Sequence, residues 1–241
     1  MIISHQYEYI FIELPRTGTT AIHKELLEKY GGKEILYKHA TYREFLKNAS
    51  SSEKDYFVFS CIRNPLDRVV SLFLKMKYKQ GVYSDKAFKE KRGIIQKLYF
   101  DRRFKYIQKY NANFSDYFKK FFIIPYDDFS CLDHSQFDYV IQFENLQNDF
   151  SEVLELLNIK QKRPLPVINK TDKKEDNYLK YFTNNIRRKS VKIFGPWMSL
   201  NNYDLPKSWE RYPLNTLDFI RFKFFRLLRK FFYLYIYRLN K

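Results

Sequence analysis

The chain has 241 residues, of which 20% are aromatic and 45% are hydrophobic, so it is long enough to bury a core as one domain. This composition, without a Gly/Ser-rich or Pro-rich tract, excludes a disordered chain. The 44 Lys and Arg residues outweigh the 27 Asp and Glu residues and give a formal charge of +17, which favours polyanionic partners such as nucleic acid, acidic glycans, anionic lipid or a phosphate-rich nucleotide. The alternative is a basic surface without such a partner.

The cysteines and the apolar runs bear on location. Cys61 and Cys131 form neither a disulfide framework nor a zinc-binding pattern, which favours a reducing compartment. The amino-terminal stretch lacks the basic lead and the small-residue cleavage site of a signal peptide. No apolar run reaches the about 18 residues that a membrane span needs. We therefore expect a cytoplasmic protein.

The first predicted element is a strand over residues 8–13, a short run rich in β-branched and aromatic residues. A turn follows, and a helical pattern begins at Thr19 or Thr20. Gly18 allows close approach of the backbone, and a helix that begins there directs its unpaired N–H groups and positive dipole end back into the turn. This arrangement suits a phosphate.

A second loop surrounds His39, within residues 36–46. A short apolar run precedes the histidine. Thr41, with Glu44 three residues later, predicts a capping box and a helical stretch after it. We expect this loop to open at the same edge of the sheet as the first.

The second strand is predicted over residues 56–62 and is again followed by a helical pattern. Arg63 leaves the end of this strand, and Pro65 suits the first position of a helix. Arg68 and Ser71 are three residues apart and share one helical face. Two guanidinium groups and a hydroxyl therefore converge beside the first loop, as a ligand with two separated phosphates would require.

The remaining segments are a helical insertion over the sheet at residues 86–122, a third strand at 137–143, a helix at 144–159 and a polar loop at 160–176. Successive strand–loop–helix units predict an α/β fold, with a parallel sheet flanked by helices. We expect one domain over residues 1–215, followed by a basic, aromatic helix at 216–241.

The phosphate loop differs from that of nucleotide triphosphatases. Their motif, G-x-x-x-x-G-K-[ST], requires a Gly-Lys pair that this chain lacks, and Arg16 stands near the start of the loop instead. A nucleotide kinase is therefore disfavoured, although it stays an alternative.

Two stretches in this order resemble the sulfotransferases that use 3′-phosphoadenosine 5′-phosphosulfate (PAPS). "LPRTGTTAI" is similar to that family's 5′-phosphosulfate loop, and "IRNPLDRVVSLF" is similar to its 3′-phosphate motif, R-[ND]-P-x-x-R-x-x-S. The resemblance implies a P-loop-like fold. It assigns the 3′-phosphate to Arg63 and Ser71, and the 5′-phosphosulfate to the first loop, with the backbone of Thr17 to Thr20 and the hydroxyls of Thr19 and Thr20 as donors. The loop residues are Arg16, Thr17, Gly18, Thr19, Thr20 and Ala21.

One residue departs from the family's loop, because Arg16 replaces the usual lysine that steadies the departing phosphate. Arginine is always charged and can bond two oxygens, so it can still stabilise the departing phosphate. Its effect on the rate of sulfuryl transfer is left open.

Transfer of a sulfuryl group to an acceptor hydroxyl requires a base that removes the proton of that hydroxyl. The segment around His39 is similar to the His-x-[ST]-Y-x-x-F segment of glycan O-sulfotransferases, in which such a histidine is the base. The alternative is a histidine that only caps or packs. Glu13, directly before the loop, is the second candidate base, or else a partner that positions the loop. Glu144, at the end of the third strand, is a further candidate base. The weaker candidates are the histidines His5, His23 and His134.

These patterns predict transfer of a sulfuryl group from PAPS to a hydroxyl, with a carbohydrate of the cell surface as acceptor, without a metal. The runner-up is a nucleic-acid-binding or glycan-binding protein without turnover, since basic residues alternate with aromatic ones. Against nucleic acid, the basic residues are spread over the chain and no recognised binding motif appears. The helix at 216–241 predicts either peripheral contact with an anionic membrane or packing on the domain. At 100° per residue, Lys223, Arg226 and Lys230 fall on one side of it, away from Phe219, Phe222 and Leu234.

Overall fold

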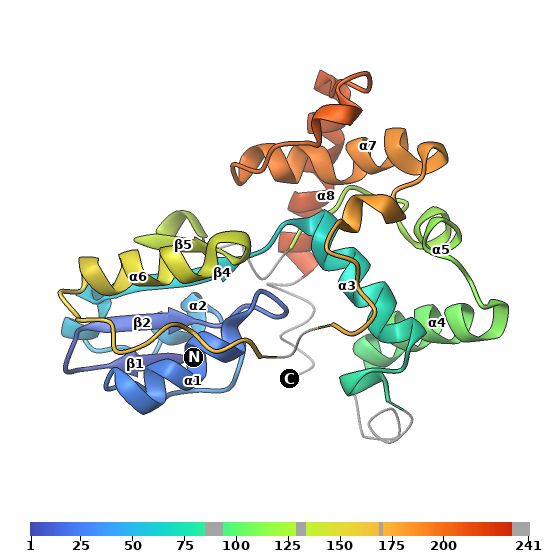
Figure 1. Ribbon diagram of the computed structural model, residues 1–241. Coiled ribbons are helices and arrows are strands. Elements are labelled where there is room, and N and C mark those ends of the chain that lie inside the picture. The colour runs from blue at the N-terminus through green and yellow to red at the C-terminus, as the bar shows by residue number, and fades with distance from the viewer. Residues whose placement is uncertain (85–93, 129–133, 169–170, 233–241) are drawn as a thin grey trace. The chain divides into compact units, whose positions relative to one another are not determined.

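The computed structural model describes residues 1–84, 94–128, 134–168 and 171–232 (Figure 1). The chain divides into two compact units, each of which is discontinuous in sequence. Unit 1 contains Met1–Asn64 and Asp128–Lys170, and unit 2 contains Pro65–Asp127 and Thr171–Lys241. Each unit is described by itself, and the single domain over residues 1–215 stays a prediction.

Unit 1 is built on a five-stranded sheet with the order β3-β1-β2-β4-β5. Strands β2, β4 and β5 run parallel, with Phe11 opposite Phe59 and Cys61 opposite Ile141. The three strands predicted from sequence are therefore present, and they form the parallel part of the sheet. The strands are β1 (Ile2–Ser4), β2 (Tyr9–Ile12), β3 (Lys33–Glu34), β4 (Phe57–Ile62) and β5 (Tyr139–Gln142).

The other side of the sheet corrects the prediction of a parallel sheet. Strand β1 pairs antiparallel with β2, and β3 pairs antiparallel with β1, so the sheet is mixed. Only residues 5–8 connect β1 to β2, and so short a connection joins antiparallel strands, whereas a parallel pair needs a long crossover. No strand is predicted from sequence in residues 1–7, so this hairpin is an addition to the prediction.

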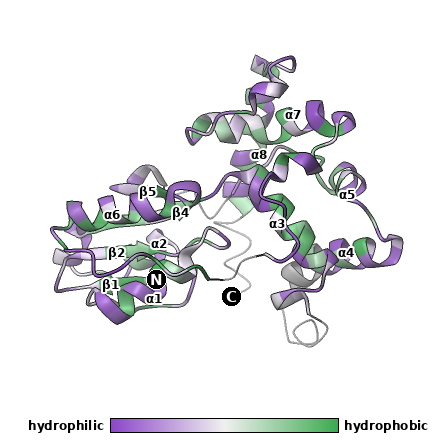
Figure 2. Cartoon of the chain, in the orientation of Figure 1, coloured by the Kyte–Doolittle hydropathy of each residue, from purple (hydrophilic) through white to green (hydrophobic). Residues whose placement is uncertain are grey.

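Two helices of unit 1, α1 (Thr19–Lys29) and α6 (Leu146–Leu156), share one core with the parallel strands. Phe11 and Phe59 both face this core because they are paired across β2 and β4, and side chains at paired positions point to the same side of a sheet. Ile22 of α1 and Phe150 of α6 are fully buried against it. Figure 2 shows both hydrophobic and hydrophilic residues along α6, as a helix with one buried face requires. The short helix α2 (Tyr42–Leu46) completes the unit.

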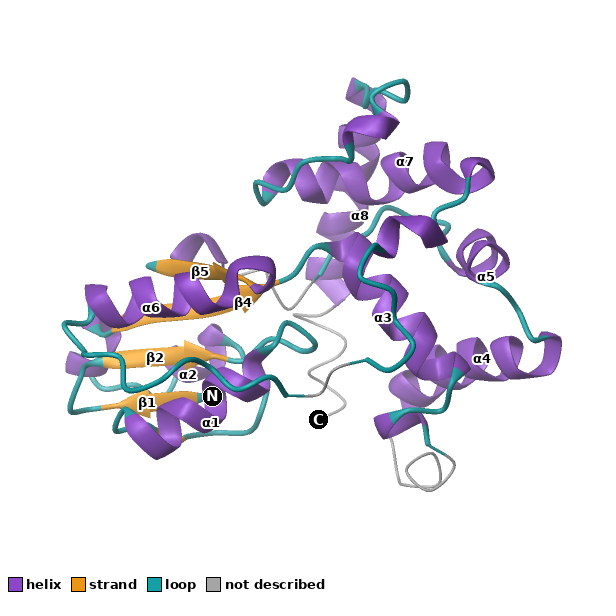
Figure 3. Ribbon diagram, viewed as in Figure 1, coloured by secondary structure: helices purple, strands orange, loops and turns teal. Residues whose placement is uncertain are grey.

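Unit 2 is helical over its described residues, and none of the five strands lies in it (Figure 3). Its first helix begins at Pro65, as the sequence predicted. The predicted helical insertion at 86–122 contains two helices, while residues 86–93 lie outside the described part and its placement over the sheet stays a prediction. The helices are α3 (Pro65–Lys77), α4 (Ile94–Tyr110), α5 (Phe114–Phe121), α7 (Asn184–Leu200) and α8 (Thr216–Phe231).

Aromatic rings form the core of unit 2. The ring of Phe118, which is fully buried, lies 4.8 Å from that of Phe122 and 5.7 Å from that of Phe194, measured between centroids. The rings of Phe114 and Phe182 complete the cluster at 6.0 and 6.2 Å. These aromatic residues pack against one another and are not presented as a platform for stacking nucleic-acid bases.

Truncation of the central ring tests this core. We expect Phe118→Ala to lower the free energy of unfolding by about 3–5 kcal/mol, because it removes the buried ring and leaves a cavity. Phe224→Ala, at a ring that is 56% exposed in the same unit, is the matched control and should cost about 0.5 kcal/mol or less. Urea unfolding of the full chain measures both, and equal losses would contradict the packing described here.

Candidate functional site

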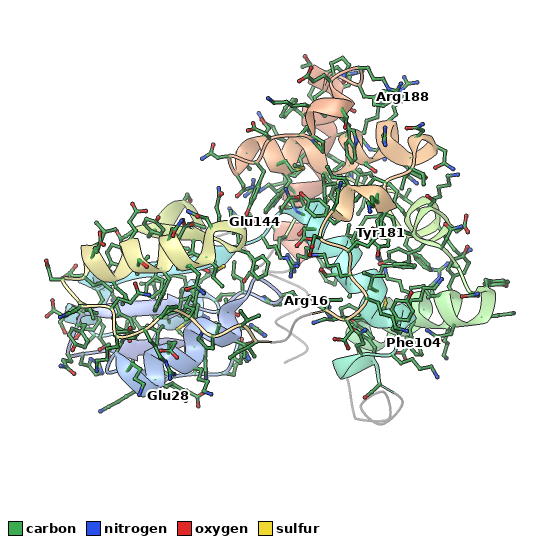
Figure 4. All side chains as sticks on the ribbon, viewed as in Figure 1. Arg16, Glu28, Phe104, Glu144, Tyr181 and Arg188 are labelled. Carbon is green, nitrogen blue, oxygen red and sulfur yellow. The ribbon has the colours of Figure 1, made fainter. Side chains whose placement is uncertain are left out.

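The candidate site lies where the parallel strands of unit 1 end. Strand β2 leads into residues 13–18, β4 into residues 63–64 and β5 into residues 143–145. The carboxyl ends of parallel strands meet at one edge of a sheet, which is where ligands of such folds bind. Figure 4 shows Arg16 and Glu144 at this edge. Because β2, β4 and β5 are parallel, these three loops share that edge.

The loop after β2 is closed by its own hydroxyl groups. The Oγ1 atoms of Thr17 and Thr19 both donate to the carbonyl oxygen of Leu14, at 3.0 and 3.2 Å. The thiol of Cys61 in β4 donates to the carbonyl oxygen of Thr17 at 2.7 Å, and burial raises the pKa of this thiol, so that it stays protonated. The side chain of Thr19 is thus used inside the loop, while Thr20 is half-buried.

The loop ends in the amino terminus of α1, which begins at Thr19 as predicted. Gly18 is the N-cap residue in a left-handed conformation, with φ of 85°, and as a glycine it provides no side chain to cap the helix. The backbone N–H of Ala21 donates to the carbonyl oxygen of Gly18 at 3.2 Å, so a phosphate would meet the N–H groups that precede it. Arg16 is half-buried and also has a positive φ, of 67°, while Ala21 is buried.

Phe143, just after β5, contacts both phosphate-binding candidates of unit 1. A Cβ atom added to Gly18 would lie 2.6 Å from Cδ2 of Phe143, so glycine is required there by space as well as by conformation. The guanidinium carbon of Arg63 lies 4.1 Å from the centroid of the Phe143 ring. Beside it, the backbone N–H of Asn64 donates to Oε1 of Glu144 at 2.8 Å. One aromatic ring therefore links the loop to the arginine at the end of β4.

His39 is attached to the start of the same loop. Its Nδ1 atom lies 2.9 Å from the backbone carbonyl oxygen of Glu13, and because a carbonyl can only accept, Nδ1 carries the proton of the neutral ring. Partial burial of the ring lowers the pKa of His39 below its ordinary value of 6.5, more than the hydrogen bond to Glu13 raises it. Thr41 and Glu44 form the predicted capping box of α2, which fixes the chain directly after the histidine.

Glu13 itself is fully buried. Its Oε1 atom accepts from the amino-terminal ammonium of Met1 at 2.9 Å and lies 3.0 Å from Nδ1 of His23, whose Nε2 lies 3.1 Å from Glu34. Burial alone would raise the pKa of Glu13, but the ammonium and His23 outweigh it and hold this pKa below the usual 4.5. The carboxylate is ionised yet enclosed, so the geometry offers it as a positioning group and does not present it to an acceptor.

The second half of the predicted 3′-phosphate motif lies in unit 2. Ser71 is buried in α3, and Nη1 of Arg68 donates to the hydroxyl of Tyr126 at 3.0 Å. Arg63 belongs to unit 1, so the convergence of Arg63 and Ser71 on one ligand stays a prediction.

Sequence reasoning missed Phe143. The signal was present, since an aromatic residue stands at the end of the third predicted strand, at the edge where the loops were expected to meet. Its two contacts are with segments more than 70 residues away and cannot be derived from local patterns.

Two other features of the described residues bear on ligands. A pocket of about 440 Å³ in unit 2 has no Lys or Arg in its lining and so does not suit a nucleotide with two phosphates. Its lining residues are Gly195, Ser199, Asn202, Tyr203, Asp204, Leu205 and Leu214. Within the described ranges, no three or more His, Cys, Asp or Glu side chains are placed to hold a metal ion, and the metal-free reaction stays a prediction.

A comparison with protein families decides the affiliation of the chain. A family model described as "Sulfotransferase family" matches residues 1–204. The chain belongs to the sulfotransferase family. Searches of curated proteins and of solved structures find no match. Family membership supports a transferase that moves a sulfuryl group, and the match includes both the loop at residues 13–20 and the segment at residues 63–71 of this sulfotransferase-family protein.

Acid unfolding tests the role of Glu13. Its folded-state pKa is lowered, so its stabilising effect is complete above the unfolded-state pKa and is lost as the pH falls through the folded-state value. We expect Glu13→Gln to lower the free energy of unfolding by about 3 kcal/mol at neutral pH. The variant should also lose the part of the pH dependence of stability that Glu13 contributes.

Glu155→Gln, at an exposed position of α6, is the matched control and should leave stability at neutral pH unchanged. Urea unfolding over a pH series measures the three proteins. A Glu13→Gln protein as stable as the original at neutral pH would show that the buried carboxylate is not needed to hold this edge of the sheet.

Proposed function

We propose that this sulfotransferase-family protein transfers the sulfuryl group of PAPS to a hydroxyl group of a carbohydrate. The observation that carries the proposal is the position of His39, whose ring is hydrogen-bonded to Glu13 at the start of a loop that opens into an uncapped helix N-terminus. This position supports a neutral base beside a site for phosphate oxygens. Sulfuryl transfer to a hydroxyl requires this combination of groups.

The loop residues 16–21 would hold the 5′-phosphosulfate, and Arg63 and Ser71 would hold the 3′-phosphate, as the family resemblance implies. Several observations support the fit. Gly18 lacks the side chain that would fill the space beside Phe143, the N–H groups of the first turn of α1 have no side-chain cap, and Arg63 carries a planar, permanent charge that can bond two phosphate oxygens.

PAPS supplies an activated sulfuryl group, whose bond to the 5′-phosphate oxygen breaks as the bond to the acceptor oxygen forms. His39 takes the acceptor's proton on Nε2, which is the unprotonated nitrogen because Nδ1 donates to Glu13. The lowered pKa keeps this ring neutral at pH 7. Arg16 stabilises the negative charge that collects on the departing phosphate, as an arginine can do without giving up a proton.

The carbohydrate acceptor is inferred from the resemblance of residues 36–46 to glycan O-sulfotransferases and from the formal charge of +17, which suits acidic glycans. The alternatives lack a comparable observation. A kinase would need the Gly-Lys pair that the loop does not have. A nucleic-acid surface would need exposed stacking aromatics, whereas the aromatic cluster around Phe118 is packed in the core of unit 2.

Nucleotide discrimination tests the role of Arg63. We expect 3′-phosphoadenosine 5′-phosphate (PAP) to bind far more tightly than 5′-AMP, and Arg63→Ala to weaken PAP at least about tenfold, because a charged hydrogen bond contributes about 1.5–3 kcal/mol. Affinity for 5′-AMP should hardly change. Calorimetry measures both, and Arg43→Ala, an exposed arginine of α2, is the control. Equal affinity of the original protein for the two nucleotides would refute the assignment.

Turnover tests the role of His39. We expect His39→Ala to reduce sulfuryl transfer from labelled PAPS to a cell-envelope carbohydrate fraction by about 10²–10⁴-fold, with PAP affinity almost unchanged, because a general base acts on the transition state. In the original protein the rate should fall on the acid side with a midpoint below 6.5, since the base must be neutral and its pKa is lowered.

His5→Ala, at an exposed histidine of the same unit, is the control and should keep both the rate and the pH profile. If His39→Ala transfers label as fast as the original protein, another group removes the proton.

A further inference from the structure

One side of helix α8 packs against the rest of unit 2. Phe222 is buried, the guanidinium of Arg226 lies 5.8 Å from its ring, and Nε of Arg226 lies 4.0 Å from a carboxylate oxygen of Asp127. This corrects the helical-wheel prediction that put Arg226 on the side away from Phe222. The two residues are four positions apart and therefore lie on the same side of the helix.

The opposite side of α8 is apolar and exposed. Its large side chains recur at intervals of three and four residues, so they form one stripe along the helix, which we name the apolar face of α8. Such a row of exposed large apolar side chains is unusual on a protein surface that contacts only water. The face consists of Leu217 (72% exposed), Ile220 (57%), Phe224 (56%), Leu227 (66%), Leu228 (47%) and Phe231 (56%).

Cationic residues border the apolar face on both sides. At about 100° per residue, Lys223 and Lys230 follow one border and Arg221 follows the other, and all three are exposed. Nη2 of Arg221 donates to the carbonyl oxygen of Ile123 at 2.8 Å, which brings this exposed isoleucine beside the helix. The single acidic residue of Thr216–Phe231 is Asp218, which is buried and occupied in the N-terminal capping box.

We infer that the apolar face of α8 docks on an anionic membrane surface. Leu and Phe side chains would enter the boundary between headgroups and acyl chains, while the bordering Lys and Arg side chains would reach lipid phosphates. Among the described helices none is long and apolar enough to cross a membrane. Helix α8 also lies beyond residues 1–204, which the family model matches.

Charge decides between the membrane and a second copy of the chain. Pairing two apolar faces of α8 would bring the bordering cations of one copy beside those of the other, and the helix offers no exposed carboxylate to pair with them. An anionic lipid surface compensates the same cations. The inference concerns a different part of the molecule from sulfuryl transfer and does not depend on it.

Vesicle co-sedimentation of the full chain tests the inference. We expect the protein to bind phosphatidylcholine vesicles that contain phosphatidylglycerol, to bind vesicles of phosphatidylcholine alone much more weakly, and to be released by salt. Phe224→Gln combined with Leu227→Gln should weaken binding at least about tenfold, because two apolar anchors are lost. Leu200→Gln, at an exposed leucine of α7, is the matched control.

Charge reversal provides a second set of variants. Lys223→Glu combined with Lys230→Glu should weaken binding to the anionic vesicles by about tenfold or more. Lys54→Glu combined with Lys160→Glu changes the net charge equally at exposed positions of unit 1 and should have a much smaller effect.

Circular dichroism of every variant checks that it is folded. The inference is overturned if the original protein ignores anionic vesicles, or if both pairs of α8 variants bind as well as their controls. It is also overturned if the original protein is a dimer that Phe224→Gln with Leu227→Gln dissociates, with no binding to vesicles, because the apolar face would then be an interface between copies.

Discussion

A buried carboxylate organises the site. Glu13 directly follows β2 and has no exposed surface, and a charge so enclosed is tolerated only when it is paired. Its side chain binds the ammonium of Met1 and lies against His23, while its backbone carbonyl holds the ring of His39. The next residues form the phosphate loop. One position thus fixes the end of β2, the start of the loop and the tautomer of the candidate base.

Contacts within the protein position the loop. The hydroxyls of Thr17 and Thr19 fold it onto Leu14, and the thiol of Cys61 attaches it to β4. Phe143 then fills the space beside Gly18 and contacts Arg63. Groups held in this way need little rearrangement when charge develops on a phosphate, and such preorganised groups are a main source of electrostatic catalysis.

Local patterns predicted local structure well. The start of α1, the capping box at Thr41 and the parallel strands depend on neighbouring residues, and the sequence displays them directly. The pairing of Glu13, the contacts of Phe143 and the hairpin that makes the sheet mixed depend on tertiary contacts or on a strand too short to recognise. The exposed side of α8 was also not predictable, because a helical wheel shows which residues share a face but not which face the domain covers.

The protonation state of the His39 ring most directly tests the claim that its Nε2 atom accepts the proton of the acceptor hydroxyl. Nitrogen-15 NMR of the protein labelled at histidine, with the signal assigned by comparison with a His39→Gln variant, reports which ring nitrogen carries the proton. We expect a neutral ring at pH 7 with the proton on Nδ1 and a titration midpoint below 6.5. A proton on Nε2 at pH 7, or a midpoint above 6.5, would contradict the account, because the nitrogen proposed to accept the proton would already hold one.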